Sequence, residues 1–426
     1  MLEFKLCKDK TCIGFGFDEL EGFIPVCIEL NERFRHVAIF GSTGTGKTTL
    51  LSNMMLQDFC NNFGFCFIDP KGDAVNELLS RGLKLKVEDL ILIDPLSSVD
   101  FSINFLKIPD HVKNREAFKE VVVCTFVELL KHQTKFWGER FGRLFEALVR
   151  GILDYNEQLK ENKQLDILDL YLILLKKDKL IKFAEQLRDP LLKEYIIESL
   201  RIKGEDLSRE AILRRLNDWI HNKIVRAMFC KNKKENLNFE EIIESGKIIL
   251  VKIPKGELGN SATQLFGTIF ISLIWANVKS KGIKITGANN PYFLYIDEFH
   301  SFAFNKGFFD ELLSESRAFN LGTTIATQYP SQLPVEIRNA VYSNCSTLIV
   351  FNVQNPYDAE QLSLRIPDIT ASDILNLGKF EAYVRLHVDC RPETIKIRTY
   401  PPFCINSRKI VTFCLSDKGK RIFQKY

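Results

Sequence analysis

Three segments that lie far apart in the sequence contain residues suited to cleaving a phosphoanhydride bond. They are a glycine-rich loop ending in Lys47 and Thr48, the acidic pair Asp297 and Glu298, and the polar residue Gln328. An ammonium group, a hydroxyl, two carboxylates and an amide are the groups with which phosphate-binding loops and their partner strands handle nucleoside triphosphates. The surrounding elements must bring these groups to one place.

The glycine-rich segment has the form G-x-x-x-x-G-K-T and the flanks of a phosphate-binding loop. The apolar run Val37–Phe40 precedes it, and a helical pattern begins at Thr49. Glycines let backbone N–H groups turn inward around a β-phosphate, and the helix N-terminus adds its positive dipole end. Lys47 is expected to reach the β- and γ-phosphates, and the Thr48 hydroxyl to ligate Mg²⁺. The sequence therefore predicts that ATP is bound by Gly41, Ser42, Thr43, Gly44, Thr45, Gly46, Lys47, Thr48 and Thr49.

The segment "FLYIDEF", Phe293–Phe299, has the form of a Walker B strand. Asp297 at the strand end is expected to hold Mg²⁺ through water, and Glu298 to orient and activate the attacking water. An ordinary strand that ends in an acidic turn has the same sequence pattern. The phosphate-binding loop upstream favours the catalytic interpretation.

Gln328 follows the apolar run Thr323–Ala326 and Thr327. In open parallel sheets the carboxyl ends of the strands form the ligand crevice, so Gln328 is expected to sense the γ-phosphate. The alternative is a solvated polar cap of the strand.

Arg317 follows a helical pattern whose apolar residues are Phe308, Leu312 and Leu313. An arginine near the crevice can reach the γ-phosphate of a neighbouring subunit and stabilise transition-state charge. A cation at a helix C-terminus can equally serve the helix dipole. The spacing alone does not choose between these interpretations.

Apolar strands that alternate with helical patterns occupy residues 1–109 and 236–426. This alternation predicts an α/β fold of the RecA-like type, with a mainly parallel central sheet covered by helices. Residues 110–235 contain apolar residues at helical spacing and few strand signals, which predicts an all-helical insertion domain. Glu381–Arg398 is expected to form a C-terminal β-hairpin, and a basic tail follows it.

The composition limits the function classes. The formal net charge is only +4, so contact with nucleic acid requires local basic patches. The eleven cysteines are scattered without a C-x-x-C pair, which favours reduced, buried thiols in a cytoplasmic protein and no metal site. The longest apolar run, Leu265–Val278, contains polar residues and is expected to be a buried helix, so no intrinsic membrane anchor is expected.

These motifs together resemble the HerA–FtsK superfamily of ATPases, and most closely its conjugative coupling branch, the TraG/TraD/TrwB-like proteins and their DUF87-type relatives. The resemblance covers most of the chain. The segments that carry it are Gly41–Thr49, Phe67–Asp73, Phe136–Leu148, Val251–Gly259, Tyr295–Ala303, Leu312–Leu333 and Ser343–Ser363.

The resemblance implies a hexameric ring that pulls DNA through its central channel, with Arg317 acting in trans. It also implies that the helical insertion corresponds to the all-alpha domain of coupling proteins. Two features depart from the pattern. The chain starts about forty residues before the phosphate-binding loop, so the N-terminal transmembrane helices of typical coupling proteins are not expected. There is also no room for the full N-terminal barrel of HerA. Separately, His300 stands where relatives often have glutamine, and no role is assigned to it.

The leading hypothesis is an ATP-driven DNA translocase of a ring-forming type, binding DNA without reading its sequence. It would act in conjugative transfer, segregation or genome packaging, with a relaxase, secretion channel or capsid as partner. The basic residues that are candidates for phosphate contacts are Lys252, Lys255, Arg408, Lys409, Lys418, Lys420, Arg421 and Lys425. The alternatives are a ring ATPase that remodels or secretes protein without contacting DNA, and a nucleotide-dependent docking module with slow turnover.

Overall fold

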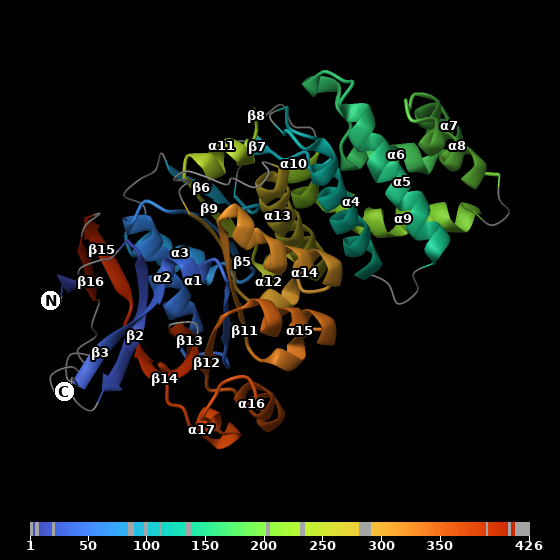
Figure 1. Cartoon of the computed structure of the whole chain (residues 1–426). Coiled ribbons are helices and arrows are strands. Elements are labelled where there is room, and N and C mark those ends of the chain that lie inside the picture. The colour runs from blue at the N-terminus through green and yellow to red at the C-terminus, as the bar shows by residue number, and fades with distance from the viewer. Residues whose placement is uncertain are drawn as a thin grey trace. The chain divides into compact units, whose positions relative to one another are not determined.

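The computed structural model describes residues 3–4, 8–18, 22–83, 89–97, 101–110, 112–132, 138–201, 205–230, 235–280, 291–388, 391–407 and 410–413. The chain divides into two compact units. The first comprises Met1–Leu92, Ile242–Lys252 and Thr286–Tyr426, and the second comprises Ile93–Glu241 and Ile253–Ile285. Figure 1 shows the elements of both units along the chain.

The centre of the first unit is a sheet that has eleven strands among the described residues. Their order is β3-β2-β14-β13-β12-β4-β11-β10-β5-β9-β6. The strands from β12 to β9 pair in parallel, while β13, β14, β2 and β3 extend the sheet in antiparallel pairing. The expected α/β fold with a mainly parallel centre is confirmed. The bounds are β2 (Lys10–Asp18), β3 (Gly22–Glu29), β4 (Val37–Phe40), β5 (Gly64–Asp69), β6 (Leu90–Ile93), β9 (Ile248–Lys252), β10 (Tyr292–Ile296), β11 (Leu321–Thr327), β12 (Thr347–Phe351), β13 (Glu381–Val388) and β14 (Arg391–Thr399).

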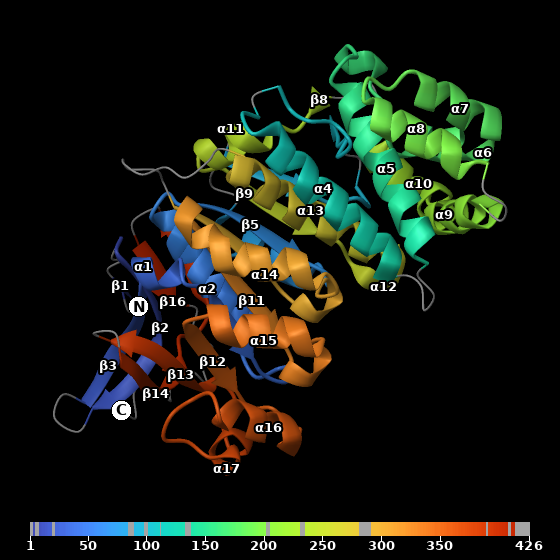
Figure 2. The ribbon, with the colours of Figure 1, turned by 45° about the vertical axis from the view of Figure 1, so that its right-hand side comes forward.

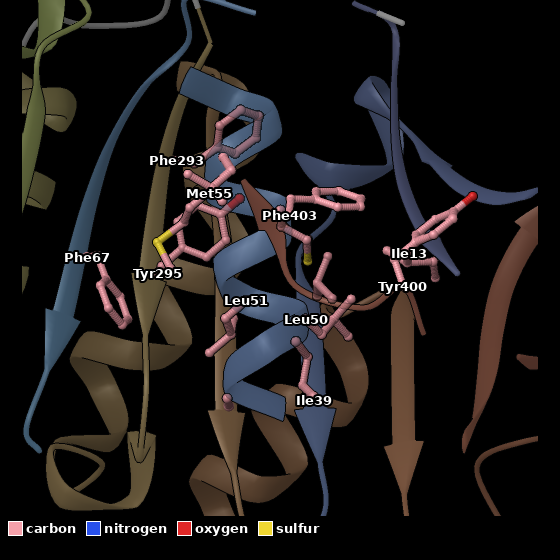
Figure 3. Close-up of a cluster of buried hydrophobic side chains, with 14 of the residues drawn as sticks. Ile13, Ile39, Leu50, Leu51, Met55, Phe67, Phe293, Tyr295, Tyr400 and Phe403 are labelled. Atoms are coloured by element: carbon pink, nitrogen blue, oxygen red, sulfur yellow. The ribbon is translucent and has the colours of Figure 1, made fainter. Parts of the chain in front are cut away.

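Helices cover both faces of this sheet because its central strands are apolar on both sides. Side chains alternate between the faces. Ile39 of β4 packs with Leu50 of helix α2 (Lys47–Cys60), as Figure 3 shows. Phe40, the next residue, faces the other way, and its ring lies 6.2 Å from that of Tyr342 in α15 (Val335–Asn344). Figure 2 shows α14 (Lys306–Glu315) beside α15. The first face is completed by α3 (Asp73–Ser80).

A buried ion pair ties helix α2 to strand β10. Arg33, at the end of α1 (Leu30–Arg33), donates from Nη2 to Asp58 Oδ2 at 2.9 Å, and both side chains are fully buried. Tyr295 of β10 donates its hydroxyl to the same Asp58 oxygen at 2.5 Å, and Arg33 also lies 3.5 Å above the ring of Phe293. A buried charge is tolerated only when it is paired and hydrogen-bonded. The network therefore fixes the helix of the phosphate-binding loop against the strand that carries Asp297.

The second unit is mostly helical within the described residues. The short strands β7 (Phe101–Ser102) and β8 (Glu235–Asn236) pair in parallel. Its bounds, 93–241 with 253–285, are wider than those of the insertion expected at 110–235. Its helices are α4 (Arg115–His132), α5 (Glu139–Asn156), α6 (Ile167–Leu175), α7 (Lys177–Glu185), α8 (Pro190–Ser199), α9 (Glu205–Ile220), α10 (Lys223–Phe229), α12 (Lys255–Leu258) and α13 (Asn260–Ser280), and α11 (Phe239–Glu244) leads back toward β9.

Helix α13 contains the apolar run Leu265–Val278. In the described part of the chain it alone is long and apolar enough to cross a membrane, with a mean hydropathy of 1.3. Because 89% of that window is buried inside the structure, it has the surroundings of a core helix. The expectation of a buried helix is confirmed.

The expectation of reduced cysteines is wrong for Cys12, Cys27 and Cys404, which are disulfide-bonded. Cys12 of β2 and Cys27 of β3 are directly opposed in the antiparallel ladder and form a disulfide, with their Cα atoms 3.8 Å apart. The hairpin brings together residues that the sequence separates by 15 positions, which a search for close C-x-x-C pairs does not detect. Cys60, Cys66, Cys124, Cys230 and Cys345 are in the reduced form.

The C-terminal part of the first unit continues with α16 (Pro356–Ser363) and α17 (Ala371–Leu375). The predicted hairpin is confirmed, because Glu381 of β13 pairs with Arg398 of β14. A separate small sheet joins β1 (Glu3–Phe4), β16 (Ile410–Phe413) and β15 (Phe403–Ser407). The basic tail residues Arg408, Lys409, Lys418, Lys420, Arg421 and Lys425 lie outside the described residues.

Candidate active site

The glycine-rich loop leaves the carboxyl end of β4 and enters α2. Gly44 and Gly46 have φ values of +82° and +125°, which L-residues rarely adopt. A Cβ on Gly41 would lie 2.6 Å from Cβ of Phe351, so this position also has no room for a side chain. The Gly41 N–H donates to the Gln328 carbonyl at 3.0 Å, and the Ser42 N–H to the Asn352 carbonyl at 2.8 Å. The loop is thus anchored to the ends of both strands that flank β4.

Lys47 opens helix α2 and is 6% exposed. Its Nζ donates to the carbonyl oxygens of Gly41 and, at 3.2 Å, Ser42. Burial lowers the pKa of Lys47, while the nearby carboxylates of Asp297 and Glu298 act in the opposite direction. An ammonium group held only by two backbone carbonyl oxygens is suited to exchange those partners for phosphate oxygens.

The strand order brings the three predicted segments to one edge. Strand β11 lies between β4 and β10, and all three run parallel. Their carboxyl ends therefore place Gln328 between the glycine-rich loop and the acidic pair. The Gln328 Nε2 lies 3.4 Å from both Oε1 and Oε2 of Glu298. The structure thus brings Lys47, Glu298 and Gln328 together as expected from their strand-end positions.

The acidic pair is buried at the end of β10. Asp297 is 3% and Glu298 5% exposed, and Glu298 has a φ of +45°. The Glu298 N–H donates to Asp297 Oδ1 at 2.9 Å. Burial, together with the neighbouring charge of Glu298, raises the pKa of Asp297 to about 6. A divalent cation beside this carboxylate would favour its ionised form.

Sequence reasoning assigned no chemistry to Lys71, which lies in this site. Lys71 follows β5, the strand next to β10, and its Nζ donates to Glu298 Oε1. Asp69 fixes the loop, because its Oδ1 accepts from the Lys71 N–H at 2.9 Å and its Oδ2 from the Val75 N–H at 3.0 Å. The rule that pointed to Gln328, a polar residue just after a parallel strand, would have found Lys71 in "FIDPKGD" as well.

His300 also reaches the acidic pair. Its Nδ1 lies 3.5 Å from Glu298 Oε2 and 3.4 Å from Thr327 Oγ1. Thr327 donates to Gln332 Oε1 at 3.0 Å, and the same oxygen accepts from the Gln328 N–H at 3.2 Å. These bonds hold the turn that carries Gln328.

Arg317 is not part of this cluster. It is exposed in the turn Ser316–Phe319, which precedes β11 and therefore lies at the amino end of the parallel strands. There it lines a cavity of 410 Å³ together with His36, Arg365 and Arg385. The four residues of strand β4 run from this end to the glycine-rich loop, a span of about 13 Å at roughly 3.3 Å per residue. The structure thus places Arg317 and Lys47 at opposite ends of the sheet.

The donor set fits a hydrated Mg²⁺ held jointly with a nucleotide. Among the described residues there is no cluster of three His, Cys, Asp or Glu side chains arranged to hold a metal. Thr48, half-buried at the start of α2, and Asp297 lie at the same edge of the sheet, where they would supply oxygen ligands. Mg²⁺ typically keeps several waters and takes one or two protein ligands together with substrate phosphates.

Similarity to known proteins agrees with this geometry. The chain matches solved structures of the bacterial conjugative coupling protein TrwBdeltaN70 in its unbound form (14% identity, 91% of this chain and 90% of that chain, TM-score 0.66). It matches TrwB in complex with ADP and Mg²⁺ similarly (16% identity, 91% and 90%, TM-score 0.66). VirB4 of Thermoanaerobacter pseudethanolicus also matches (14% identity, 91% and 95%, TM-score 0.60). At these identities the matches show a shared fold.

No curated protein matches the sequence. The family model described as "Helicase HerA, central domain" (DUF87) matches residues 13–264, more than half of the chain. This range contains the glycine-rich loop and the loop of Lys71. The chain therefore belongs to the DUF87 family, the HerA central-domain family of P-loop proteins.

Proposed function

We propose that the protein is an Mg²⁺-dependent ATPase. The observation that carries the proposal is the convergence of Lys47, Gln328 and Glu298 at the carboxyl ends of three adjacent parallel strands and the helix that follows the first of them. ATP would be bound by residues 41–49, and Mg²⁺ by Thr48 and Asp297. The structures of TrwB with ADP and Mg²⁺ and with an ATP analogue support this choice of ligands.

The residues divide the chemistry between them. Lys47 would balance the charge of the β- and γ-phosphates, and the bound cation would neutralise the charge that develops on their oxygens. Glu298 would accept a proton from the attacking water while the water oxygen bonds to the γ-phosphorus. The bond from that phosphorus to the bridging oxygen breaks, and ADP leaves with the electron pair. Gln328, hydrogen-bonded to Glu298, would orient the same water.

The position of Arg317 supports a role in trans. Since it lies at the opposite end of the strands from its own loop, it would serve a neighbouring subunit whose loop faces it. A head-to-tail ring supplies such a junction at every interface, and we propose a homohexamer. The cavity that Arg317 lines also contains Arg365 and Arg385, a local concentration of positive charge suited to a phosphate.

The proposed work of the ATPase is to move DNA. The fold that the chain shares with a conjugative coupling protein supports this proposal. The DNA movement would serve conjugative transfer, segregation or genome packaging. The protein would act in the cytoplasm, contact DNA phosphates without reading sequence, and cooperate with a relaxase, secretion channel or capsid. The helical residues 110–235 would form its accessory domain.

The decisive experiment is the ATPase rate with and without duplex and single-stranded DNA over a range of salt concentrations. A DNA-stimulated rate that falls as salt rises supports the translocase. A Lys47-dependent rate that no DNA changes would instead favour a ring ATPase that remodels or secretes protein. Absence of turnover with intact nucleotide binding would leave only a docking module.

A further inference from the structure

Lys71 forms an ion pair with Glu298, the residue proposed above to activate water. The two side chains differ in exposure: that of Lys71 is 50% exposed, and that of Glu298 is 6% exposed. Burial alone would lower the pKa of Lys71, but its hydrogen bond to Glu298 raises it, so the side chain is a fully charged ammonium group. The pair therefore joins a fixed, buried carboxylate to a cation with one side open to solvent.

Hydrogen bonds fix the backbone at Lys71, whereas the ammonium group is held by its ion pair with Glu298 and is otherwise open to solvent. Asp69 accepts from the Lys71 N–H and from the Val75 N–H, and Gly72 turns the chain with a φ of +83° into helix α3. A lysine head group on a flexible four-carbon stem can change partners without movement of this loop. The backbone of this loop can therefore stay in place while the Lys71 side chain changes its partner.

The same ammonium group blocks part of the surface that Glu298 needs. Lys71 occupies one acceptor position on Oε1, and the second oxygen faces Gln328 and His300, so few acceptor positions of Glu298 remain for an attacking water. A paired ammonium group also makes a carboxylate a weaker proton acceptor, so release of Lys71 would make Glu298 a better base. Lys47 and Lys71 are near enough to influence each other electrostatically, so a terminal phosphate on Lys47 would bring strong negative charge within the range of Lys71.

We propose that Lys71 is a phosphate-responsive residue that exchanges Glu298 for the terminal phosphate of bound ATP, and thereby frees Glu298 only when the substrate is complete. The inference rests on the proposed ATPase function. With ADP, which lacks that phosphate, Lys71 stays on Glu298. In the ATP state Lys71 adds a third positive group beside Lys47 and the cation, where charge develops during transfer. Release of phosphate returns Lys71 to Glu298.

A double-mutant cycle tests the exchange directly. Unfolding temperatures are measured for the wild type, Lys71→Met, Glu298→Gln and the double variant in three states: without nucleotide, with Mg²⁺ and ADP, and with Mg²⁺ and a non-hydrolysable ATP analogue. The shifts are expected to be non-additive in the first two states and additive with the analogue, because only there is the pair already separated. A lysine with a purely structural role would stay coupled in all three states, and that result, or additivity without nucleotide, overturns the exchange.

Turnover supplies the second measurement. Lys71→Met is expected to lower kcat by roughly 10²-fold, the usual effect of removing one transition-state donor, and Lys71→Arg to recover part of it. A rise in kcat would show that Lys71 only restrains Glu298, and would contradict the phosphate contact. Lys396→Met is the matched control, because Lys396 is also about half exposed and pairs with Glu381 at 3.6 Å outside the site.

If the wild type shows no Lys47-dependent ADP binding, the proposed ATPase function and the exchange both fail. Normal binding with an unchanged coupling in all three states removes the exchange alone.

Discussion

The side-chain amide of Gln328 lies 3.4 Å from each carboxylate oxygen of Glu298, although the two residues follow different strands. Gln328 ends the strand next to β4, and its carbonyl also accepts from the Gly41 N–H. A single residue therefore touches the glycine-rich loop through its backbone and the acidic pair through its side chain. A ligand that moves the glycine-rich loop would therefore also move Gln328 relative to Glu298, and the reverse holds as well.

Glu298→Gln should keep ATP bound but slow its cleavage by at least about 10²-fold, since a neutral amide cannot accept the proton of water. Single-turnover hydrolysis and direct measurement of nucleotide binding check both parts. The exposed variant Glu393→Gln, the same carboxylate-to-amide change in β14 outside the site, is the control and should retain most of the turnover. Near wild-type cleavage in Glu298→Gln would disprove the role of this residue as the base.

Arg317→Ala should bind ATP normally and lose turnover by roughly 10³-fold or more, the usual effect of removing an arginine finger. Lys47→Ala should lose both binding and turnover. Mixed rings of the two inactive variants, made by co-expression, should regain part of the activity because some intact loops then face an intact arginine. Mixed rings that show no recovery would remove the trans assignment, as would a protein that stays monomeric with and without DNA.

DNA affinity should depend steeply on salt and little on sequence, because phosphate contacts release counterions. With about four contacts the affinity is expected to fall by roughly 10²-fold between about 50 and 200 mM salt. Titration of two unrelated duplexes of equal length at several salt concentrations measures both properties. Affinity that stays flat over this range would count against the DNA motor.

The stability of the first unit should fall between pH 6.5 and 4 because of His36. This histidine is 1% exposed and its Nδ1 accepts from the Thr323 N–H at 3.1 Å, and burial lowers its pKa from 6.5 to about 4. Between these values the unfolded chain binds a proton that the folded chain does not, so stability is lost as the pH falls, by up to about 3 kcal/mol.

His36→Asn should flatten this dependence while keeping the fold, because asparagine tolerates the φ of +63° found at this position. Denaturant unfolding at several pH values measures the slope for the wild type, this variant and the exposed control His221→Asn. The control should retain the wild-type slope. Equal slopes in all three proteins would show that the acid sensitivity comes from other groups.

The sequence was most informative where one local pattern decides the structure. Apolar runs ending in polar residues predict the parallel strands and, through them, the positions of Asp297 and Gln328 at the carboxyl ends of those strands. The strand order, which sets the actual distances, depends on pairing between residues far apart in the chain. The buried Arg33, Asp58 and Tyr295 network could not be predicted for this reason, since Arg33 and Tyr295 are separated by 262 positions.

Two features that the sequence analysis does not predict nevertheless have a signal in the sequence. The cysteines of β2 and β3 lie in a hairpin, where opposed residues are near each other whatever their spacing in the sequence. The position of Lys71 after a parallel strand had the same meaning as that of Gln328. Its partner was hidden because the choice of Glu298 among several nearby charges is made by side-chain geometry.

Because Arg317 and Lys47 lie at opposite ends of the parallel strands, each copy of the chain has two different ends. One end carries the arginine, and the other carries the glycine-rich loop. A two-fold dimer uses the same surface patch on both copies, so it would complete both sites only if the loop and Arg317 lay on one patch. Head-to-tail repetition joins them when they lie on separate surfaces, and closure into a ring leaves no end without its counterpart. In such a ring every active site depends on an interface, so opening one interface would inactivate one site. It would also expose two complementary surfaces to which another subunit could bind.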